Sequence, residues 1–318
     1  MEYVFARAGR PEHSEHRRAA VLAVSAFDGV HREQQRLLAE AVALANRLGV
    51  APVALLPWPP SSDGQALDGI LTTLAERICL IERNAPAAQL VILSADASQL
   101  WAPETLLGRI TSEWDVKTLV IDPSADEQLC GIELADAARQ HGLSLATLPQ
   151  TENATTPMGA RIRAAISAGR VAEAAQALTY DYALSGEVIG GDRRGRLLGF
   201  PTANLRVDAG KMIPANGIYA VRVGLPGEHE AARQAVASVG VRPTFGDDNA
   251  RLVEVHLLDF NMDLYGVRVT TEFVEWLRPE ERFESVEALI RQMTDDVQQA
   301  RERLAQRERR DSPGHAHP

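Results

Sequence analysis

The stretch AAVLAVSAFDGVHREQQRLLAEAVALANRLGVAPVALL, residues 19–56, determines the fold of the first half of this chain. It begins with an apolar run over residues 19–27, turns at residues 28–31 and continues as a helical pattern over residues 32–48. Gly49 ends the helix, and a second apolar run follows. Two strands joined by a helix are parallel and cross over with a right-handed connection, so this stretch predicts an open α/β sheet.

The same alternation continues along the next hundred or so residues. We predict helices at 71–84, 103–113 and 128–140, and strands at 90–94, 118–121 and 144–148. Strands and helices that alternate in this way are typical of an open α/β domain.

The pattern changes after residue 150. A loop rich in Thr, Asn, Pro and Gly, residues 151–159, precedes two predicted helices, 160–168 and 171–178. Strand-like runs separated by turn signals then predominate, at 183–189, 217–224, 234–241, 252–259 and 267–276. They predict an antiparallel barrel or sandwich, on which a final helix after Ser285 packs its apolar face. We therefore divide the chain into a polar arm (1–18), an α/β domain (19–178), a β-rich domain (179–308) and a disordered tail (309–318).

Composition limits the class of protein. The 318 residues are too many for one typical core, which agrees with two domains. A formal net charge of -10 argues against a nucleic-acid partner, because such binding needs a basic face. The two cysteines, Cys79 and Cys130, have neither metal-ligand nor disulfide-framework spacing, and we predict that they are buried free thiols. With no apolar run typical of a signal peptide or a membrane span, we expect a cytoplasmic protein without a membrane partner.

Residues 191–204 carry the strongest chemical signal. Glycines flank an arginine cluster, and Pro201-Thr202-Ala203-Asn204 follows at once. Glycine lets backbone N–H groups approach an anion, arginine supplies charge, and threonine and asparagine offer oxygen ligands to a hard cation. The stretch predicts a site for nucleotide phosphates with Mg²⁺. Glu254, alone among apolar residues in a strand-like run, is a candidate general base. The structural alternatives are a capped turn for residues 201–204 and a solvated glutamate for Glu254.

A series of motifs in the second half resembles a known family. These motifs are 198–205 (LGFPTANL), 214–219 (PANGIY), 240–245 (GVRPTF), 253–260 (VEVHLLDF), 263–266 (DLYG) and 277–280 (LRPE). Residues 180–306 resemble a riboflavin kinase domain, and the whole chain resembles the bacterial bifunctional riboflavin kinase/FMN adenylyltransferase (FAD synthetase) family.

The resemblance implies an α/β nucleotidyltransferase-like, Rossmann-like first domain and an antiparallel β-barrel kinase domain with a C-terminal helix. The kinase would transfer the γ-phosphoryl group of ATP to the 5′-hydroxyl of riboflavin and so make FMN. Glu254 would accept the proton from that hydroxyl, and Thr202 and Asn204 would hold Mg²⁺ and the phosphates. Two residues in the region where the family binds flavin, Arg278 and Asp296, are flavin-binding candidates, with a surface arginine and a helix-exposed acid as the alternatives. The loop that would cover the nucleotide contains Gly191, Arg194, Gly195, Gly199 and Pro201.

The first domain departs from the family pattern. The adenylyltransferase signature is Gly-Asn-Phe-Asp-Gly-Val-His-Arg-Gly-His-Gln, and residues 27–32 keep its centre, including Asp28 and His31. Ser25 and Ala26 replace the glycine and asparagine, and Glu33 and Gln34 replace the second glycine and histidine.

These replacements predict a loss of chemistry. Gln34 cannot carry the charge of a protonated histidine, and Glu33 adds an anion where the triphosphate of ATP would lie. Repulsion between the Glu33 carboxylate and a phosphate a few ångströms away costs on the order of several kcal/mol at an effective dielectric constant of about 20. Near residue 160, the Ser-Ser-Thr-x-Ile-Arg motif retains Ile162 and Arg163 but loses its hydroxyl groups.

We therefore expect a riboflavin kinase whose adenylyltransferase domain is degenerate. Three alternatives remain open. In the first alternative the chain is a bifunctional enzyme that also makes FAD. In the second, the first domain is a sensor of nucleotide or flavin. In the third, the first domain forms the contacts of a homo-oligomer. A flavin-binding protein without any activity conflicts with the presence of Thr202, Asn204 and Glu254.

Overall fold

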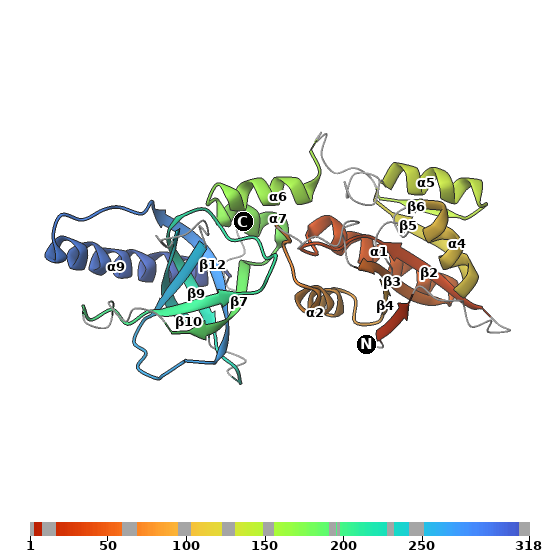
Figure 1. Ribbon diagram of the computed structural model, residues 1–318. Coiled ribbons are helices and arrows are strands. Elements are labelled where there is room, and N and C mark those ends of the chain that lie inside the picture. Colours follow the sequence, from red (N-terminus) through yellow and green to blue (C-terminus); the bar gives the residue numbers. More distant parts are fainter. Residues whose placement is uncertain are drawn as a thin grey trace. The chain divides into compact units, whose positions relative to one another are not determined.

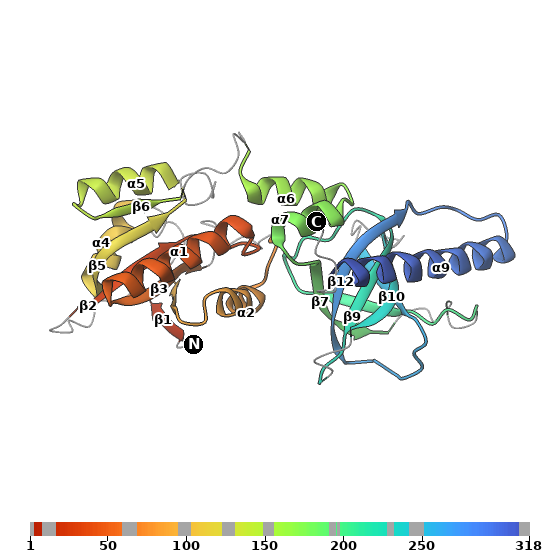
Figure 2. The same ribbon diagram turned by 180° about the vertical axis from the view of Figure 1, so that it is seen from behind.

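The computed structural model describes residues 3–7, 17–58, 69–94, 103–122, 131–148, 156–190, 195, 198–227, 232–241 and 251–311. The chain divides into two compact units, Met1–Arg161 and Ile162–Pro318 (Figures 1 and 2). Helix α7, Val171–Leu178, packs on strands of the second unit. The division into compact units thus falls inside helix α6, Met158–Ser167, ahead of the boundary that we placed after residue 178.

The first unit contains one parallel sheet in the order β1-β4-β3-β2-β5-β6. The strand order reverses between β2 and β5, and sheets of this kind bind ligands outside the carboxyl ends of the strands at such a point. The chain leaves the carboxyl end of β2 at Ser25, so the predicted adenylyltransferase signature lies at the expected place. The strands are β1 Tyr3–Arg7, β2 Arg18–Val24, β3 Ala51–Trp58, β4 Gln89–Ser94, β5 Trp114–Ile121 and β6 Leu145–Thr147.

Helices cover both faces of this sheet (Figures 1 and 2). On β2, Val21 and Ala23 belong to the core shared with α1, Arg32–Leu48, and α2, Leu74–Asn84. Residues of the opposite parity on the same strand belong to the core shared with α4, Pro103–Glu113, and α5, Gly131–Gln140. Successive side chains of a strand point to opposite faces, so a continuous apolar run is what a sheet buried on both faces requires. The predicted α/β architecture is confirmed.

Two elements of the first unit differ from the prediction. Strand β1 pairs with β4 inside the segment that we predicted as a polar arm. Its sequence, YVFAR, is short and flanked by charge, and only pairing with an existing sheet edge makes it a strand. Helix α2 begins at Leu74 rather than at residue 71, and Cys79 on this helix is exposed rather than buried as we predicted. Thr73 caps this helix: its side chain accepts from Glu76 N at 3.3 Å, and its own N–H donates to the Glu76 carboxylate at 2.8 Å.

The second unit is a closed antiparallel barrel in the order β10-β11-β8-β7-β12-β9. Helix α9, Val286–Asp311, packs Ala300 and Leu304 against the barrel, which confirms the predicted C-terminal helix. It extends into the segment predicted as a tail, and residues 312–318 lie outside the described part of the chain. The sequence pattern predicted no strand where β8 lies, and the predicted turn at residues 201–204 overlaps its first two residues. The barrel strands are β7 Tyr182–Ile189, β8 Ala203–Val207, β9 Gly217–Gly224, β10 Arg233–Val241, β11 Arg251–Leu257 and β12 Arg268–Arg278.

Two short helices complete the second unit, α6 (Met158–Ser167) and α7. Ala215 donates its N–H to the carbonyl of Ile166 at 3.1 Å, and this bond joins α6 to the chain entering β9. Among the helices that the structure describes, none is long and apolar enough to cross a membrane.

Candidate functional site

Pairing between β8 and β11 brings two predicted site residues together. Asn204 and Glu254 are direct partners in the antiparallel ladder. Directly opposite residues have Cβ atoms about 4.5–5.5 Å apart, on the same face of the sheet. On β11, Val253 and Val255 are buried in the barrel, so Glu254 between them points to the outer face. The fold thus places an amide and a carboxylate, distant in sequence, beside each other on the outside of the barrel.

A tight turn before β8 positions Thr202. The N–H groups of Leu198 and Phe200 both donate to the carbonyl of Gly195, at 3.1 and 2.9 Å. A Cβ atom at position 195 would overlap the carbonyl oxygen of Phe200 and lie 3.4 Å from Thr202 Oγ1. Gly199 has φ +87°, a conformation that favours glycine. Both glycines are therefore required by the backbone, while the predicted loop residues Gly191 and Arg194 lie outside the described residues.

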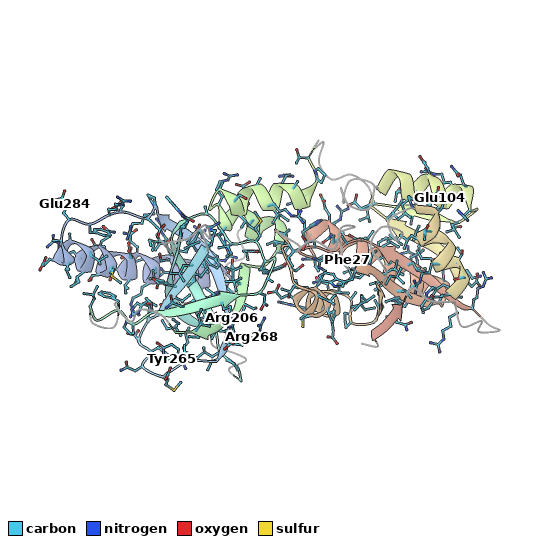
Figure 3. All side chains as sticks on the ribbon, viewed as in Figure 1. Phe27, Glu104, Arg206, Tyr265, Arg268 and Glu284 are labelled. Carbon is cyan, nitrogen blue, oxygen red and sulfur yellow. The ribbon has the colours of Figure 1, made fainter. Side chains whose placement is uncertain are left out.

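A cavity of about 660 Å³ opens beside this turn. Thr202 and Pro201 form part of its wall, and the chain after β11 forms the other side, including the half-exposed Tyr265 labelled in Figure 3. The volume lies within the range of small-molecule sites, roughly 300–1,000 Å³. The wall is polar and apolar in similar measure, and its other residues are Val188, Gly199, Ala203, Leu257, Phe260, Asn261, Met262, Asp263 and Leu264.

His256 belongs to the same neighbourhood, although we assigned it no role from the sequence. Its Nδ1 lies 2.8 Å from the carbonyl oxygen of Pro201, and its ring meets Phe200 edge-on with 5.5 Å between ring centres. The signal that could have identified it is its parity, because residues two apart on a strand share a face and Glu254 is the candidate base.

The donor set fits a hard divalent cation. Thr202 offers a hydroxyl oxygen and Asn204 an amide oxygen, with the Glu254 carboxylate opposite Asn204. Oxygen donors of this kind suit Mg²⁺, which usually keeps several waters and binds together with substrate phosphates. Within the described ranges, no three His, Cys, Asp or Glu residues gather as a metal site. A cation here would be shared between the oxygens of Thr202 and Asn204 and the phosphates of a bound nucleotide.

Arg278 and Asp296, predicted as flavin-binding candidates, contact each other. Arg278 Nε donates to Asp296 Oδ1 and its terminal nitrogen to Oδ2, both at 2.7 Å. The hydrogen bond with Asp296 raises the pKa of Arg278 above its usual value. Asp296 is only 3% exposed, so it is not the helix-exposed acid of the alternative reading. The pair joins the end of β12 to α9.

At the switch point of the first unit, where the strand order reverses, the residues predicted for the degenerate adenylyltransferase site form hydrogen bonds with one another. Gln34 is 2% exposed; its Nε2 donates to Ser25 Oγ at 3.1 Å, and its Oε1 accepts from the N–H of His31 at 3.2 Å. Gln34 is the third residue of α1, so it closes the first turn of that helix and ties it to the end of β2. Ala26 is fully buried, and Glu33 lies half-buried in the same turn.

Asp28 is the centre of a buried polar network. It accepts from the backbone N–H groups of Leu71 and Thr72 at 3.0 Å and pairs with Arg77 at 2.6 Å. Arg77, fully buried, also donates to the carbonyl of Ala26 at 2.7 Å and lies over the ring of Trp58 at 5.1 Å. Sequence reasoning did not single out Arg77. Its position within a helical pattern indicates an ordinary surface arginine, and only the tertiary structure buries it.

Arg163, the last predicted residue of the first site, lies in α6. The compact units separate just before it, after Arg161, so it belongs with the barrel rather than with Ser25 and Gln34.

Comparison with known proteins places both units. Residues 178–304 match the family described as Flavokinase: Riboflavin kinase. The chain is 30% identical to a bifunctional riboflavin kinase/FMN adenylyltransferase of Listeria monocytogenes, across 88% of this chain and 91% of the relative. It is 31% identical to the protein of that description from Escherichia coli strain K12, across 89% of this chain and 92% of the relative.

A solved structure has a similar fold. It is described as a macrolide-efflux protein from Streptococcus pneumoniae and superposes with a TM-score of 0.77 at 25% identity, covering 95% of this chain and 99% of that one.

Proposed function

The chain belongs to the bacterial bifunctional riboflavin kinase/FMN adenylyltransferase family, and we propose that its barrel makes FMN while its first unit no longer makes FAD. The observation that carries the proposal is a contrast between two sites. In the barrel, Asn204 and Glu254 are opposite each other on paired strands and Thr202 lies on the wall of a cavity, whereas in the first unit Gln34 and Ser25 are bonded to each other.

In the kinase reaction, phosphoryl transfer asks a protein mainly for alignment, neutralisation of charge and a base near the attacking hydroxyl. Glu254 accepts the proton of the riboflavin 5′-hydroxyl as its oxygen attacks the γ-phosphorus of ATP. The bond between that phosphorus and the bridging oxygen of ADP breaks, so FMN and ADP leave. A carboxylate held on a strand, opposite a cation ligand, meets these needs without rearrangement.

Thr202 and Asn204 would hold Mg²⁺, which neutralises phosphate charge when bound. The 660 Å³ cavity is large enough for a nucleotide, and Thr202 on its wall would stand next to the phosphate chain.

We propose that the first unit has lost adenylyl transfer for a structural reason. Anion binding at a helix N-terminus needs free backbone N–H groups and, in this family, positive side chains. The replacement of histidine by Gln34 removes a charge, and the carboxylate of Glu33 stands in the same helical turn. The polar atoms of Gln34 bond to Ser25 and to the backbone of His31. The scaffold and His31 are retained, but the second histidine that would stabilise departing pyrophosphate is absent.

One assay tests both statements. Purified protein is incubated with riboflavin and MgATP, and FMN is separated from FAD by chromatography; a second incubation starts from FMN. The bifunctional relative from Escherichia coli, run in parallel, shows that FAD is detectable under the same conditions. Abundant FMN with no FAD in either incubation is the expected result.

The other outcomes have definite meanings. FAD formed from added FMN contradicts the loss of adenylyl transfer and supports the bifunctional alternative. Absence of FMN contradicts the kinase proposal and leaves a binding role. The variant Glu254→Gln, which should form almost no FMN, shows that any FMN arises from the barrel site.

A further inference from the structure

His256 occupies a point where the backbone pairing of the site ends. The ladder between β8 and β11 runs from Leu205 opposite Val253 through Asn204 opposite Glu254 to Ala203 opposite Val255. Pro201 and Thr202 lie beyond the last pair, and no ladder hydrogen bond secures them to β11 in the described register. Proline also lacks an N–H group, so it cannot donate to a neighbouring strand.

The His256 side chain connects β11 to the residues that lie beyond the last pair of the ladder. A carbonyl oxygen can only accept, so the 2.8 Å contact with Pro201 means that His256 Nδ1 carries the hydrogen and donates it. The ring of His256 also meets the ring of Phe200 edge-on, at 5.5 Å and 64°. Edge-to-face contacts of this type are directional, so they restrain the orientation of both rings.

These contacts hold the chain on both sides of Thr202, one of the two proposed cation ligands. The residues before Thr202 are held by His256, and the residue after it begins the paired strand that carries Asn204. Glu254 and His256 are two residues apart on β11, so one strand face holds the base, faces Asn204 and secures the Thr202 turn. The Nδ1 hydrogen is committed to Pro201, which gives His256 a part in alignment rather than in proton transfer.

We propose that His256 is a positioning residue for riboflavin phosphorylation, acting through the Pro201 carbonyl to hold the Thr202 hydroxyl where Mg²⁺ and the phosphates of ATP need it. The inference rests on the roles proposed for Thr202 and Glu254. Displacement of a reacting group by about 1 Å can cost on the order of 100-fold in rate, so a single anchoring bond can matter far beyond its own strength.

A pair of substitutions separates the hydrogen bond from the ring. Asparagine carries an N–H donor at the same distance from Cβ as histidine Nδ1, so His256→Asn keeps the bond to Pro201 and loses the ring. Phenylalanine keeps the ring contact with Phe200 and loses the donor. We expect His256→Phe to lower kcat about 10- to 100-fold and to raise the half-saturating Mg²⁺ concentration about tenfold, with the KM for riboflavin changed less than about threefold. His256→Asn should stay within about fivefold of wild type in both quantities.

Thr270→Val is the matched control. It removes a barrel hydrogen bond, that of Thr270 Oγ1 with Ser185 Oγ at 3.2 Å, in a position outside the cavity wall. It should leave kcat and the Mg²⁺ requirement unchanged. That result would show that the loss of any one barrel hydrogen bond does not by itself lower the rate of FMN formation.

Steady-state rates of FMN formation, measured across Mg²⁺ and riboflavin concentrations for the full chain, decide the question. Wild-type values in His256→Phe, or an equal loss in His256→Asn and His256→Phe, overturn the inference. Failure of the wild-type protein to form FMN is a different result: it contradicts the proposed kinase function and removes the basis of this inference with it.

Discussion

The turn before β8 and the turn before α1 are built alike and end differently. Each contains a glycine with positive φ, Gly199 and Gly29, and each presents polar residues next to a strand or a helix. Before β8, Thr202 lies on the wall of a cavity and Asn204 faces Glu254 across two strands. Before α1, Ser25 and Gln34 bond to each other and Asp28 is enclosed with Arg77.

The difference lies in where the polar atoms find their partners. Buried polar groups must be hydrogen-bonded, and a protein satisfies them either with its own groups or with a ligand. In the first unit the partners come from the protein, so the polar groups stabilise the switch-point turn. In the second unit the turn lines open space. Each experiment below tests this difference between the structural turn of the first unit and the proposed active-site turn of the second.

The largest effect is expected from Glu254→Gln. Glutamine keeps the shape of the side chain but cannot accept the proton of the riboflavin hydroxyl, so kcat should fall at least about 10³-fold. Initial rates of FMN formation measure it. Glu275→Gln, on β12 of the same barrel with Arg303 as its partner at 3.6 Å, is the control and should keep wild-type activity. A loss of less than about tenfold in Glu254→Gln would remove it as the base.

Arg77→Met should damage stability but not chemistry. It leaves the Asp28 carboxylate buried without its cationic partner, which costs about 3–5 kcal/mol in the free energy of unfolding of the first unit. Fluorescence reports this unfolding, because Trp58 lies under the Arg77 guanidinium. FMN formation at temperatures where both units are folded should not change.

The control for Arg77→Met is Arg47→Met, which breaks the exposed pair of Arg47 with Glu40 at 3.1 Å and should cost less than about 1 kcal/mol. Equal small losses in the two variants, or a drop in kinase activity in Arg77→Met, would contradict the view that the first site is now purely structural.

Gly195→Ala tests how tightly the second turn is built. An added Cβ overlaps the carbonyl of Phe200, so the turn must shift and carry Thr202 with it. We expect kcat for FMN formation to fall about 100-fold. Gly190→Ala is a matched control, because no atom lies within 4 Å of the Cβ built there. Similar rates in the two alanine variants would show that the turn does not position the reaction.

Asp296→Ala distinguishes support from flavin binding. It removes both bonds that Asp296 accepts from Arg278, and the free energy of unfolding of the second unit should fall by about 2 kcal/mol. The exposed pair of Asp259 with Arg301 gives the control Asp259→Ala, with a loss below about 1 kcal/mol. A large rise in the KM for riboflavin without loss of stability would instead support direct flavin binding by Asp296.

The smallest effect concerns alkaline pH. Burial raises the pKa of Tyr219 from 10.0 to about 12, and its hydroxyl donates to Ala215 O at 2.6 Å. The folded pKa is above the unfolded one, so this contribution to stability is complete below about pH 10 and is lost as the pH rises through about 12. Thermal unfolding of Tyr219→Phe should therefore depend less steeply on pH between these values than wild type. Identical slopes would contradict the assignment.

The fold class was predictable because hydrophobic periodicity reports burial directly. The run 19–56 required a parallel sheet buried on both faces, and β2 confirms it. Strands β1 and β8 were missed for a physical reason. Each depends on a partner strand far away in sequence, β4 and β11, and pairing with an existing edge outweighs weak local propensity.

The candidate site could be predicted as a set of residues but not as an arrangement. Thr202, Asn204 and Glu254 were identified from motifs, whereas their proximity follows only from the register of β8 against β11. His256 and Arg77 were given no role, because a histidine or an arginine in a regular pattern carries no sign of what it will contact.

The sequence by itself determined the α/β and β-barrel halves, the family of the chain and the loss of histidine at position 34, because composition and periodicity are local properties. Only the tertiary structure decided which polar groups meet. Gln34 bonds to Ser25, Asp28 to Arg77, and Asn204 lies opposite Glu254. Hydrogen bonds and ion pairs act over a few ångströms, so their partners exist only once the chain has folded.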